Sequence, residues 1–295
     1  MGLALGGLCL AGCAEISLEE VEQASTVPPH AGDPPGELPP VTGDPAFTRT
    51  ADDPRLEWGP CPPFMPAGCE LAVVQGDPAD ENSDVFFKLA PDSLVPHHWH
   101  TSPERMVLLT GEMHVYYDDQ DPVVLTPGTY AYGPSGLGHE TYCAPGDDCV
   151  LYIAFEDAVD AIDSSEDPAP GSEDPAFIWT KDDADLEYGP CPEYMPESCG
   201  IAVLQGNPAE PNADVFFKLT PGTTAPKHYH TSAERMVLVS GEMRVNYEGQ
   251  KPTYISPMTY AYGPAKLPHD ARCLEGDEDC VLFIAFEEPV DAPQK

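Results

Sequence analysis

PHHWHTSPERMVLLTGEM (Pro96–Met113) returns 130 residues later as PKHYHTSAERMVLVSGEM (Pro226–Met243). Each copy places two histidines two residues apart, a glutamate four residues after the second of them, and a glycine after the apolar run that follows. In an extended strand, side chains two residues apart lie on the same face. The stretch therefore predicts a duplicated strand whose one face carries the side chains of a metal site.

The repetition covers most of the chain. DPAFTRTADDPRLEWGPCPPFMPAGC (Asp44–Cys69) aligns with DPAFIWTKDDADLEYGPCPEYMPESC (Asp174–Cys199) at the same offset, and the match ends at VLYIAFED and VLFIAFEE. A repeat of about 115–120 residues has the length of a whole domain rather than of a solenoid unit. We expect two domains, residues 44–157 and 174–295, joined by an acidic linker at residues 158–173.

Short runs rich in valine, tyrosine and phenylalanine fill each repeat, among them ELAVVQ, DVFFKLA, PVVLTPGTYAYG and DCVLYIAFE. Turn-forming stretches such as GDP, APDS and PSGLG separate them. This pattern is typical of strands, and no stretch keeps an apolar period of 3.6 residues over three turns. The predicted fold class is all-β, as a sandwich or a barrel.

The expected site lies inside each barrel. A buried charge is tolerated there only when it is paired or bound to a metal, and His98, His100 and Glu104 share one face of their strand. His139 follows in the next segment, and the second copy repeats the set at the same intervals. We expect two metal sites, with polar barrel interiors as the alternative, and their ligands are His98, His100, Glu104, His139, His228, His230, Glu234 and His269.

The arrangement resembles the cupin superfamily. Its first motif runs G, five residues, HxH, three or four residues, E, six residues, G. The second copy fits it throughout from Gly222 to Gly241, and the first copy differs only in having Asp92 at the first glycine position.

The second cupin motif, G, five residues, PxGxxH, three residues, N, is kept in part. The first copy has both glycines but ends in Cys143, whereas the second has Met258 and Lys266 at the glycine positions and ends in Cys273. These departures change turn residues and the terminal asparagine, never a ligand. The resemblance implies two double-stranded β-helix (jelly-roll cupin) domains in tandem, each with a three-histidine, one-glutamate metal centre.

Three further stretches, GPCPPFMPAGC, HTSAERMVLVSGE and TYAYGPAKLPH, resemble the uncharacterised cupins named after the ChrR anti-sigma factor. That family implies the fold and the ligand set, but no established reaction. Three imidazoles and a carboxylate suit a divalent transition metal, two ions per chain: manganese, iron, zinc, nickel or copper. Manganese or iron would keep open positions for a substrate or dioxygen, whereas zinc with four protein ligands would be closed and structural.

Two functions are open at this point. The first is a metal-dependent oxidoreductase, dioxygenase- or decarboxylase-like, acting on a small organic substrate, because the HWHxxxE stretch is similar to that of oxalate decarboxylases. Capture of a dicarboxylate requires a cation aimed into the barrel, and Lys88 and Lys218 are the candidates, with a structural role as the alternative. The second function is non-enzymatic binding or sensing of a metal or ligand, as in ChrR-like cupins. Catalytic residues stay unassigned, since no general acid or base has a defined position.

Four tyrosines close to the second motif have two interpretations. They could donate hydrogen bonds near the metal, or they could pack the barrel. They are Tyr130, Tyr132, Tyr260 and Tyr262.

The charge of the chain restricts its partners. It has 51 acidic and 13 basic residues, a net charge of −38. Such a surface repels the phosphate backbone of nucleic acids and anionic lipid headgroups. We expect a small-molecule ligand or substrate, no nucleic acid, and an oligomeric state that the sequence does not define.

The first thirteen residues, MGLALGGLCLAGC, end in a tetrad that resembles the lipobox of bacterial lipoproteins. The resemblance predicts a signal peptide at residues 1–13, a lipid anchor at Cys13, and a flexible linker at residues 14–43. No lysine or arginine precedes the apolar run, so a chance apolar stretch is the alternative. The expected location is the bacterial cell envelope, lipid-anchored and periplasmic or extracellular.

Eight further cysteines, four per repeat, agree with export. An even set outside the cytoplasm indicates disulfides, and the short loops CPPFMPAGC and CAPGDDC favour local pairs. A zinc site is the rival interpretation, although seven or five intervening residues do not match its usual spacing.

Overall fold

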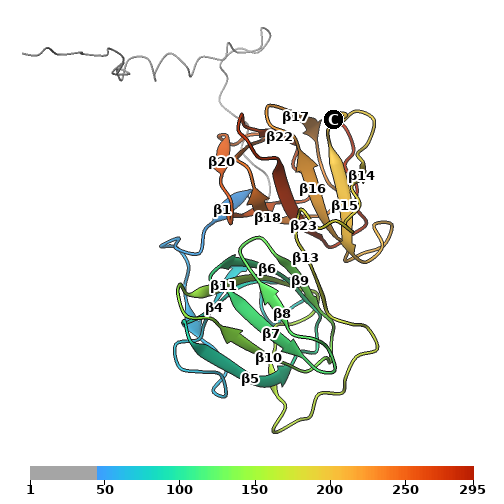
Figure 1. The fold of residues 1–295 in the computed structure, drawn as a ribbon. Coiled ribbons are helices and arrows are strands. Elements are labelled where there is room, and N and C mark those ends of the chain that lie inside the picture. Colours follow the sequence, from blue (N-terminus) through green and yellow to red (C-terminus); the bar gives the residue numbers. More distant parts are fainter. Residues whose placement is uncertain (1–44) are drawn as a thin grey trace, which may run out of the picture. The chain divides into compact units, whose positions relative to one another are not determined.

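The computed structural model describes residues 45–295, where every regular element is a β-strand (Figure 1). The predicted all-β class is therefore confirmed. The expected signal peptide at residues 1–13 and the expected linker at residues 14–43 lie outside the described residues. Within residues 45–295, no helix is long and apolar enough to cross a membrane.

The first repeat forms a jelly-roll barrel from two antiparallel sheets that enclose one apolar core. In spatial order, the larger sheet contains β13 (Phe177–Trp179), β9 (Tyr130–Gly133), β6 (Glu104–Thr110), β11 (Cys149–Phe155), β4 (Asp84–Leu89), β3 (Glu70–Gln75) and β2 (Gly59–Pro60). The smaller sheet contains β12 (Ile162–Asp163), β5 (Ser93–Trp99), β10 (His139–Cys143), β7 (Met113–Tyr117) and β8 (Val123–Leu125).

The second repeat forms a matching barrel around its own core. Its larger sheet contains β1 (Phe47–Arg49), β21 (Tyr260–Gly263), β18 (Glu234–Ser240), β23 (Cys280–Phe286), β16 (Asp214–Leu219), β15 (Gly200–Gln205) and β14 (Gly189–Pro190). Its smaller sheet contains β17 (Thr224–His228), β22 (His269–Cys273), β19 (Met243–Tyr247) and β20 (Thr253–Ile255).

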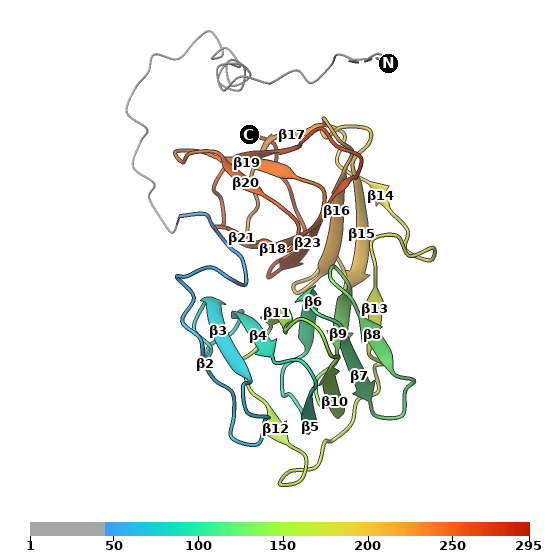
Figure 2. The same cartoon turned by 60° about the vertical axis from the view of Figure 1, so that its left-hand side comes forward.

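Each repeat gives its first strand to the sheet of the other repeat. β1 pairs with β21 of the second barrel, which places Phe47 opposite Tyr262. β13 pairs with β9 of the first barrel (Figure 2), which places Phe177 opposite Tyr132. The facing rings are stacked, with centroids 5.3 and 5.2 Å apart. The exchange ties the two barrels together at their edges.

The central strands of the larger sheets are buried on both faces. In β11, Leu151 and Ile153 face the barrel core, whereas Tyr152 and Ala154 belong to a second apolar cluster to which both repeats contribute. All seven residues of β11 and of β23 are buried. Burial on both faces explains why these strands read as continuous apolar runs instead of alternating.

Two matching polar clusters lie within this shared layer. Arg105 of the first repeat lies 3.4 Å from Asp214 of the second, and Tyr130 donates to the same carboxylate at 2.7 Å. The reciprocal cluster repeats these contacts, at 3.3 and 2.7 Å, with Arg235, Asp84 and Tyr260. Both arginines and both aspartates are fully buried, so each charge is neutralised by the other repeat.

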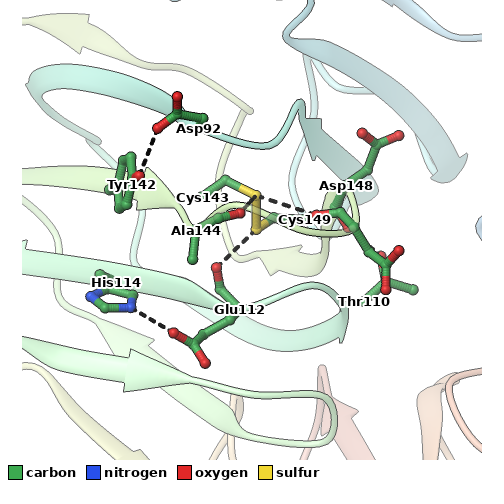
Figure 3. Close-up of a disulfide and its surroundings, with 10 residues drawn as sticks. Asp92, Thr110, Glu112, His114, Tyr142, Cys143, Ala144, Asp148 and Cys149 are labelled. Carbon is green, nitrogen blue, oxygen red and sulfur yellow. Dashed lines mark hydrogen bonds and ion pairs between the residues drawn. A yellow bond between two sulfur atoms is a disulfide. The ribbon is translucent and has the colours of Figure 1, made fainter.

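Four disulfides close local loops, as the cysteine spacing predicts. One of them joins the end of β10 to the start of β11 beside the hydrogen bond from Tyr142 to Asp92, 2.8 Å long (Figure 3). Gly111 packs onto this disulfide with a φ of 80°, and a Cβ there would approach Cys149 Sγ to 2.9 Å. The glycine that ends the first motif is thus required by its positive φ and by close contact with the backbone of Asp148 and Cys149 as well as with the disulfide. The four pairs are Cys61–Cys69, Cys143–Cys149, Cys191–Cys199 and Cys273–Cys280.

The segment after the last strand of each barrel folds back over that barrel. In the first repeat this is part of the stretch expected as a linker: β12 pairs with β5, and the Val159 N–H donates to the Pro78 carbonyl at 2.9 Å (Figure 2). In the second repeat, the Val290 N–H donates to the Pro208 carbonyl at the same distance. Both segments therefore help to enclose the barrel interiors.

Candidate metal centres

The four predicted ligand residues of the first repeat come from neighbouring strand ends. His98 lies on β5, His100 follows the end of that strand, Glu104 begins β6, and His139 begins β10. His139 pairs with His98 across the sheet, and all four side chains are buried. The prediction that His98, His100 and Glu104 share one strand is wrong, because β5 of the smaller sheet ends at Trp99 and Glu104 begins β6 of the larger sheet. The fold still brings the HxH stretch, the glutamate and the distant histidine to one place.

The second repeat builds the same arrangement. His228 ends β17, His230 follows it, Glu234 begins β18, and His269 begins β22 opposite His228. These four side chains are buried as well. All eight predicted ligand residues therefore gather in two groups of four.

The distances within each group suit a common ion. One ring nitrogen from each of the three histidines lies within 4.8 Å of the others in both barrels. The Glu104 oxygens lie 3.4 Å from His100 Nε2 and 3.5 Å from His139 Nε2, and the corresponding distances in the second barrel are 3.1 and 3.4 Å. Nitrogen and oxygen ligands bind zinc at about 2.0–2.2 Å, so donors around one such ion lie about 3–4 Å apart.

Backbone carbonyls fix the orientation of every imidazole. In the first barrel, Nδ1 of His98 and of His139 donates to the carbonyl two residues earlier, at 2.8 and 3.3 Å, and His100 Nδ1 donates to the Asp160 carbonyl. In the second barrel the corresponding bonds of His228 and His269 are 2.7 and 3.3 Å long. A proton held on Nδ1 leaves the Nε2 lone pair free to bind a metal.

Burial sets the charge of these groups. It lowers the pKa of His98 to about 4, with help from His100, and it raises the pKa of Glu104 to about 7. Nε2 of His100 and of His230 is buried without a hydrogen-bond partner among the described residues. Neutral imidazoles with unused lone pairs beside a carboxylate fit a divalent transition-metal ion.

Each centre faces a cavity inside its barrel. The first cavity has a volume of about 260 Å³ and the second of about 150 Å³. Their walls are mainly aliphatic, aromatic and methionine side chains, such as Met65, Phe87, Val115 and Ile153 in the first barrel. No lysine or arginine lines either cavity.

The lysines proposed to capture a dicarboxylate lie outside the cavities. Lys88 pairs with Glu70 and stands 4.3 Å from the centre of the Trp58 ring. Lys218 stands 4.0 Å from the centre of the Tyr188 ring. Both side chains have the structural role that the sequence offered as the alternative.

The four tyrosines near the second motif are also absent from the cavity walls. Tyr130 and Tyr260 bind the buried aspartates between the repeats, and Tyr132 stacks on the exchanged strand through Phe177. Tyr262 stacks on Phe47 in the same way. Packing is therefore their role.

Two other tyrosines, which were not among the predicted site residues, do line the cavities. Tyr117 and Tyr247 have buried hydroxyls without a hydrogen-bond partner among the described residues, and their rings lie 5.3 and 5.0 Å from those of His139 and His269. Burial raises the pKa of both, so they stay protonated. A signal existed: each is the last inward residue of an alternating strand, MHVYY in β7 and MRVNY in β19.

Comparison with known proteins adds a family and a fold. A family model described as "Domain of unknown function (DUF4437)" matches residues 39–289. A structure of oxalate decarboxylase from Bacillus subtilis at pH 4.6 has a TM-score of 0.54 and 16% identity, over 88% of this chain and 81% of that chain. One from work on the Mn(II) centres of the same enzyme has a TM-score of 0.53 and 16% identity, over the same shares. These likenesses establish two cupin barrels in tandem, the fold that the sequence predicts. No curated protein matches the chain.

Proposed function

Since the chain belongs to the DUF4437 family, whose description names no activity, we propose a function from the geometry of its own sites. Each barrel binds one divalent transition-metal ion, manganese, iron or zinc, and the bound ion acts on a small organic molecule in the adjoining cavity. The ligands are His98, His100, Glu104 and His139 in the first barrel, and His228, His230, Glu234 and His269 in the second.

One observation carries the proposal: the inward orientation of six neutral imidazoles. Every Nδ1 of the set donates to a backbone carbonyl, so every Nε2 is available on the cavity side. Without a metal, Nε2 of His100 and of His230 is buried without a hydrogen-bond partner among the described residues, at a cost of about 1–3 kcal/mol for each buried group. A metal ion removes that cost at both sites.

The reaction class that we favour is oxidoreductase chemistry, dioxygenase- or decarboxylase-like. A bound manganese or iron ion supplies Lewis acidity, redox capacity and open positions for a substrate. The protein contributes orientation of the ligands through the carbonyl bonds. Its apolar walls exclude water, and the Tyr117 and Tyr247 hydroxyls provide hydrogen-bond donors beside the centre.

The alternative is a non-enzymatic protein that binds or senses a metal or a ligand. One observation favours it: among the described residues, the carboxylates that line the cavities besides Glu104 and Glu234 already accept hydrogen bonds. Asp160 accepts hydrogen bonds from the Thr101 N–H at 3.0 Å and the Thr101 hydroxyl at 2.7 Å. Asp291 accepts from the Thr231 N–H at 3.0 Å. Both carboxylates therefore hold the residue after a histidine ligand in place.

We also propose that the protein is exported and anchored to the cell envelope through Cys13. Four disulfides support an oxidising compartment. Replacing Cys13 by alanine is expected to move the protein from the membrane fraction to the soluble fraction. Equal membrane association of both forms would contradict the anchor.

Metal content tests the main proposal. We expect mass spectrometry to find about two manganese, iron or zinc ions per chain in protein purified from Ala14 onward without chelators. His98→Ala/His100→Ala should halve that number. Two half-buried histidines outside the metal groups provide the control: His97→Ala/His114→Ala should leave it unchanged.

The identity of the ion separates the two functions. Manganese or iron, together with turnover of small organic substrates, would support the oxidoreductase. Two zinc ions without turnover would favour the binding protein. A protein that contains no metal and takes up none would refute both.

A further inference from the structure

The charge of the cavity walls restricts what can enter. Besides the ligand residues, the ionisable side chains that line the first cavity are Tyr117 and Asp160, and those that line the second are Tyr247 and Asp291. Manganese or iron bound by four protein ligands keeps open positions for oxygen atoms of a ligand. A carboxylate that lies too far from the ion to occupy them would meet apolar walls or an acidic side chain, which is strongly unfavourable. The walls therefore select molecules whose polar atoms gather at one end.

The Tyr117 hydroxyl provides a specific partner for that end. It is buried, it has no hydrogen-bond partner among the described residues, and it lies beside the glutamate ligand: a Cβ placed on Gly133 would be 3.2 Å from the hydroxyl and 3.4 Å from Glu104 Oε2. An unsatisfied buried donor costs about 1–3 kcal/mol, which a ligand oxygen would recover.

The two cavities differ in size and polarity. The first is the larger, about 260 against about 150 Å³, and it includes Thr141 where the second has Ala271. Both positions lie on the strand that begins with the last histidine ligand, β10 or β22. The first barrel thus offers a second hydroxyl close to the metal site.

The cavities also differ in how they are closed. Each is bordered by a disulfide loop and by the segment after the last strand, residues 159–161 in the first barrel and 290–292 in the second. In the second barrel the Tyr194 hydroxyl donates to the Ala292 carbonyl and joins these two borders. The first barrel has Phe64 at that position, which has no hydroxyl, so the bond cannot form.

We propose that the two sites have different roles: the first cavity binds the small-molecule ligand, whereas the second is closed by Tyr194 and retains only its metal. The ligand is a mainly apolar molecule with one oxygen-containing end, which faces the metal centre and accepts a hydrogen bond from Tyr117. This inference rests on the proposed metal sites. Dicarboxylates whose two carboxylates are separated by an apolar spacer, such as succinate, are not ligands of this cavity.

Calorimetric titration of p-cresol into the manganese-loaded protein, without oxygen, tests the proposal. We expect one p-cresol per chain and no heat from succinate. Tyr117→Phe should weaken binding about five- to tenfold, as the loss of one hydrogen bond predicts. Its counterpart Tyr247→Phe should leave binding unchanged, and Thr141→Ala, which copies the second barrel, should weaken it about twofold to fivefold.

Opening the second cavity gives an independent result. Tyr194→Phe should raise the number of bound p-cresol molecules from one to two per chain. Two molecules bound to the unmodified protein, or a loss of affinity in Tyr247→Phe instead of Tyr117→Phe, would overturn the proposal.

The metal content of the same samples distinguishes a failure of the ligand assignment from a failure of the proposed metal sites. Protein with two manganese ions that binds succinate but not p-cresol, or neither, would overturn the ligand assignment and leave the metal sites intact. Protein that holds no manganese would refute the proposed function itself.

Discussion

Burial prepares the metal-ligand side chains for an ion and has a consequence for the metal-free protein. The pKa of His98, of His228, of His230 and of His269 is lowered to about 4 by burial, and those of His100 and His139 are lowered as well. In the unfolded chain a histidine titrates near pH 6.5, so between pH 6.5 and 4 the unfolded state binds more protons. These six groups therefore stabilise the fold at neutral pH, and that stability is lost as the pH falls.

We expect the six histidines to lower the melting temperature of the metal-free protein between pH 6.5 and 4.5. Buried carboxyl groups oppose this contribution, because burial raises the pKa of Glu104 to about 7 and that of Asp214 to about 6, and raises the pKa values of Asp84, Glu156, Glu234 and Glu287 as well. Substitution therefore isolates the histidine contribution in calorimetric melts at both pH values. His98→Asn should raise the melting temperature at pH 4.5 relative to that at pH 6.5, while His97→Asn, at a half-buried side chain outside the metal group, should change this difference less. Identical pH slopes in all three proteins would contradict this account.

At two positions where the second repeat departs from the cupin motifs, the backbone keeps the left-handed conformation of the motif glycine. The motif glycines Gly128 and Gly136 have φ values of 89° and 77°, and their counterparts Met258 and Lys266 adopt φ values of 65° and 64°. The left-handed conformation costs a residue with a Cβ about 1–2 kcal/mol. The packing of the rest of the barrel therefore holds these two turns in the left-handed conformation.

Lys266→Gly is expected to stabilise the protein by up to about 1 kcal/mol, because the strain removed exceeds the extra chain entropy of glycine, about 0.5–1 kcal/mol. The reverse change at the matched site, Gly136→Lys, should destabilise it, since a Cβ there would lie 3.0 Å from the Gly171 carbonyl oxygen and from Pro170 Cγ. Urea unfolding measures both. A destabilised Lys266→Gly variant would show that the lysine side chain has a role that the backbone argument omits.

At the scale of elements, β6 performs two tasks on its two faces. Glu104 points toward the metal centre, and the next residue, Arg105, points into the layer shared with the second repeat. β18 does the same with Glu234 and Arg235. The alternation of strand side chains therefore couples the position of a ligand to the contact between repeats.

Removing one partner of the buried Arg105–Asp214 ion pair should lower the free energy of unfolding. Asp214→Ala leaves the Arg105 charge buried without its aspartate, and such a loss costs about 3–5 kcal/mol. We expect about 3 kcal/mol, because the Glu156 carboxylate lies 3.8 Å from Arg105 Nε and partly compensates. Denaturant unfolding measures the change, and Arg105→Leu/Asp214→Leu should recover most of it. A single variant as stable as the unmodified protein would mean that the pair contributes nothing.

Period-two alternation was enough to predict the strands, but not the course of the chain between His98 and Glu104, which the sequence placed on one strand: β5 of the smaller sheet ends at Trp99, and Glu104 begins β6 of the larger sheet. Alternation also could not identify what covers the outer face of β6, because the cover is a strand surface of the other repeat, more than 100 residues away in sequence. The three-residue strands β1 and β13 are too short to show a pattern, so their exchange was invisible. Tyr117 was within reach, since the alternation MHVYY places it beside Met113 and Val115 on the inner face.

At the scale of the whole molecule, the contact between the repeats has the form of a two-fold interface within one chain. The strand that accepts an exchanged partner has the same sequence in both repeats, YAYG in β9 and in β21. The arginine–aspartate contact also occurs twice, with the donor and acceptor repeats interchanged. A surface that contacts its own copy in this way is self-complementary, as in a symmetric dimer.

Residues 174–295 alone are therefore expected to form a dimer. In that fragment β13 would lack β9, but β21 of a second copy offers the same edge, and Arg235 of one copy would reach Asp214 of the other. Light scattering after gel filtration should give twice the mass of the fragment. Asp214→Lys would place two cations in each polar cluster and should abolish the dimer. A folded, monomeric fragment would show that the buried layer tolerates water, and that the exchange of strands follows from the covalent linkage instead of driving the contact.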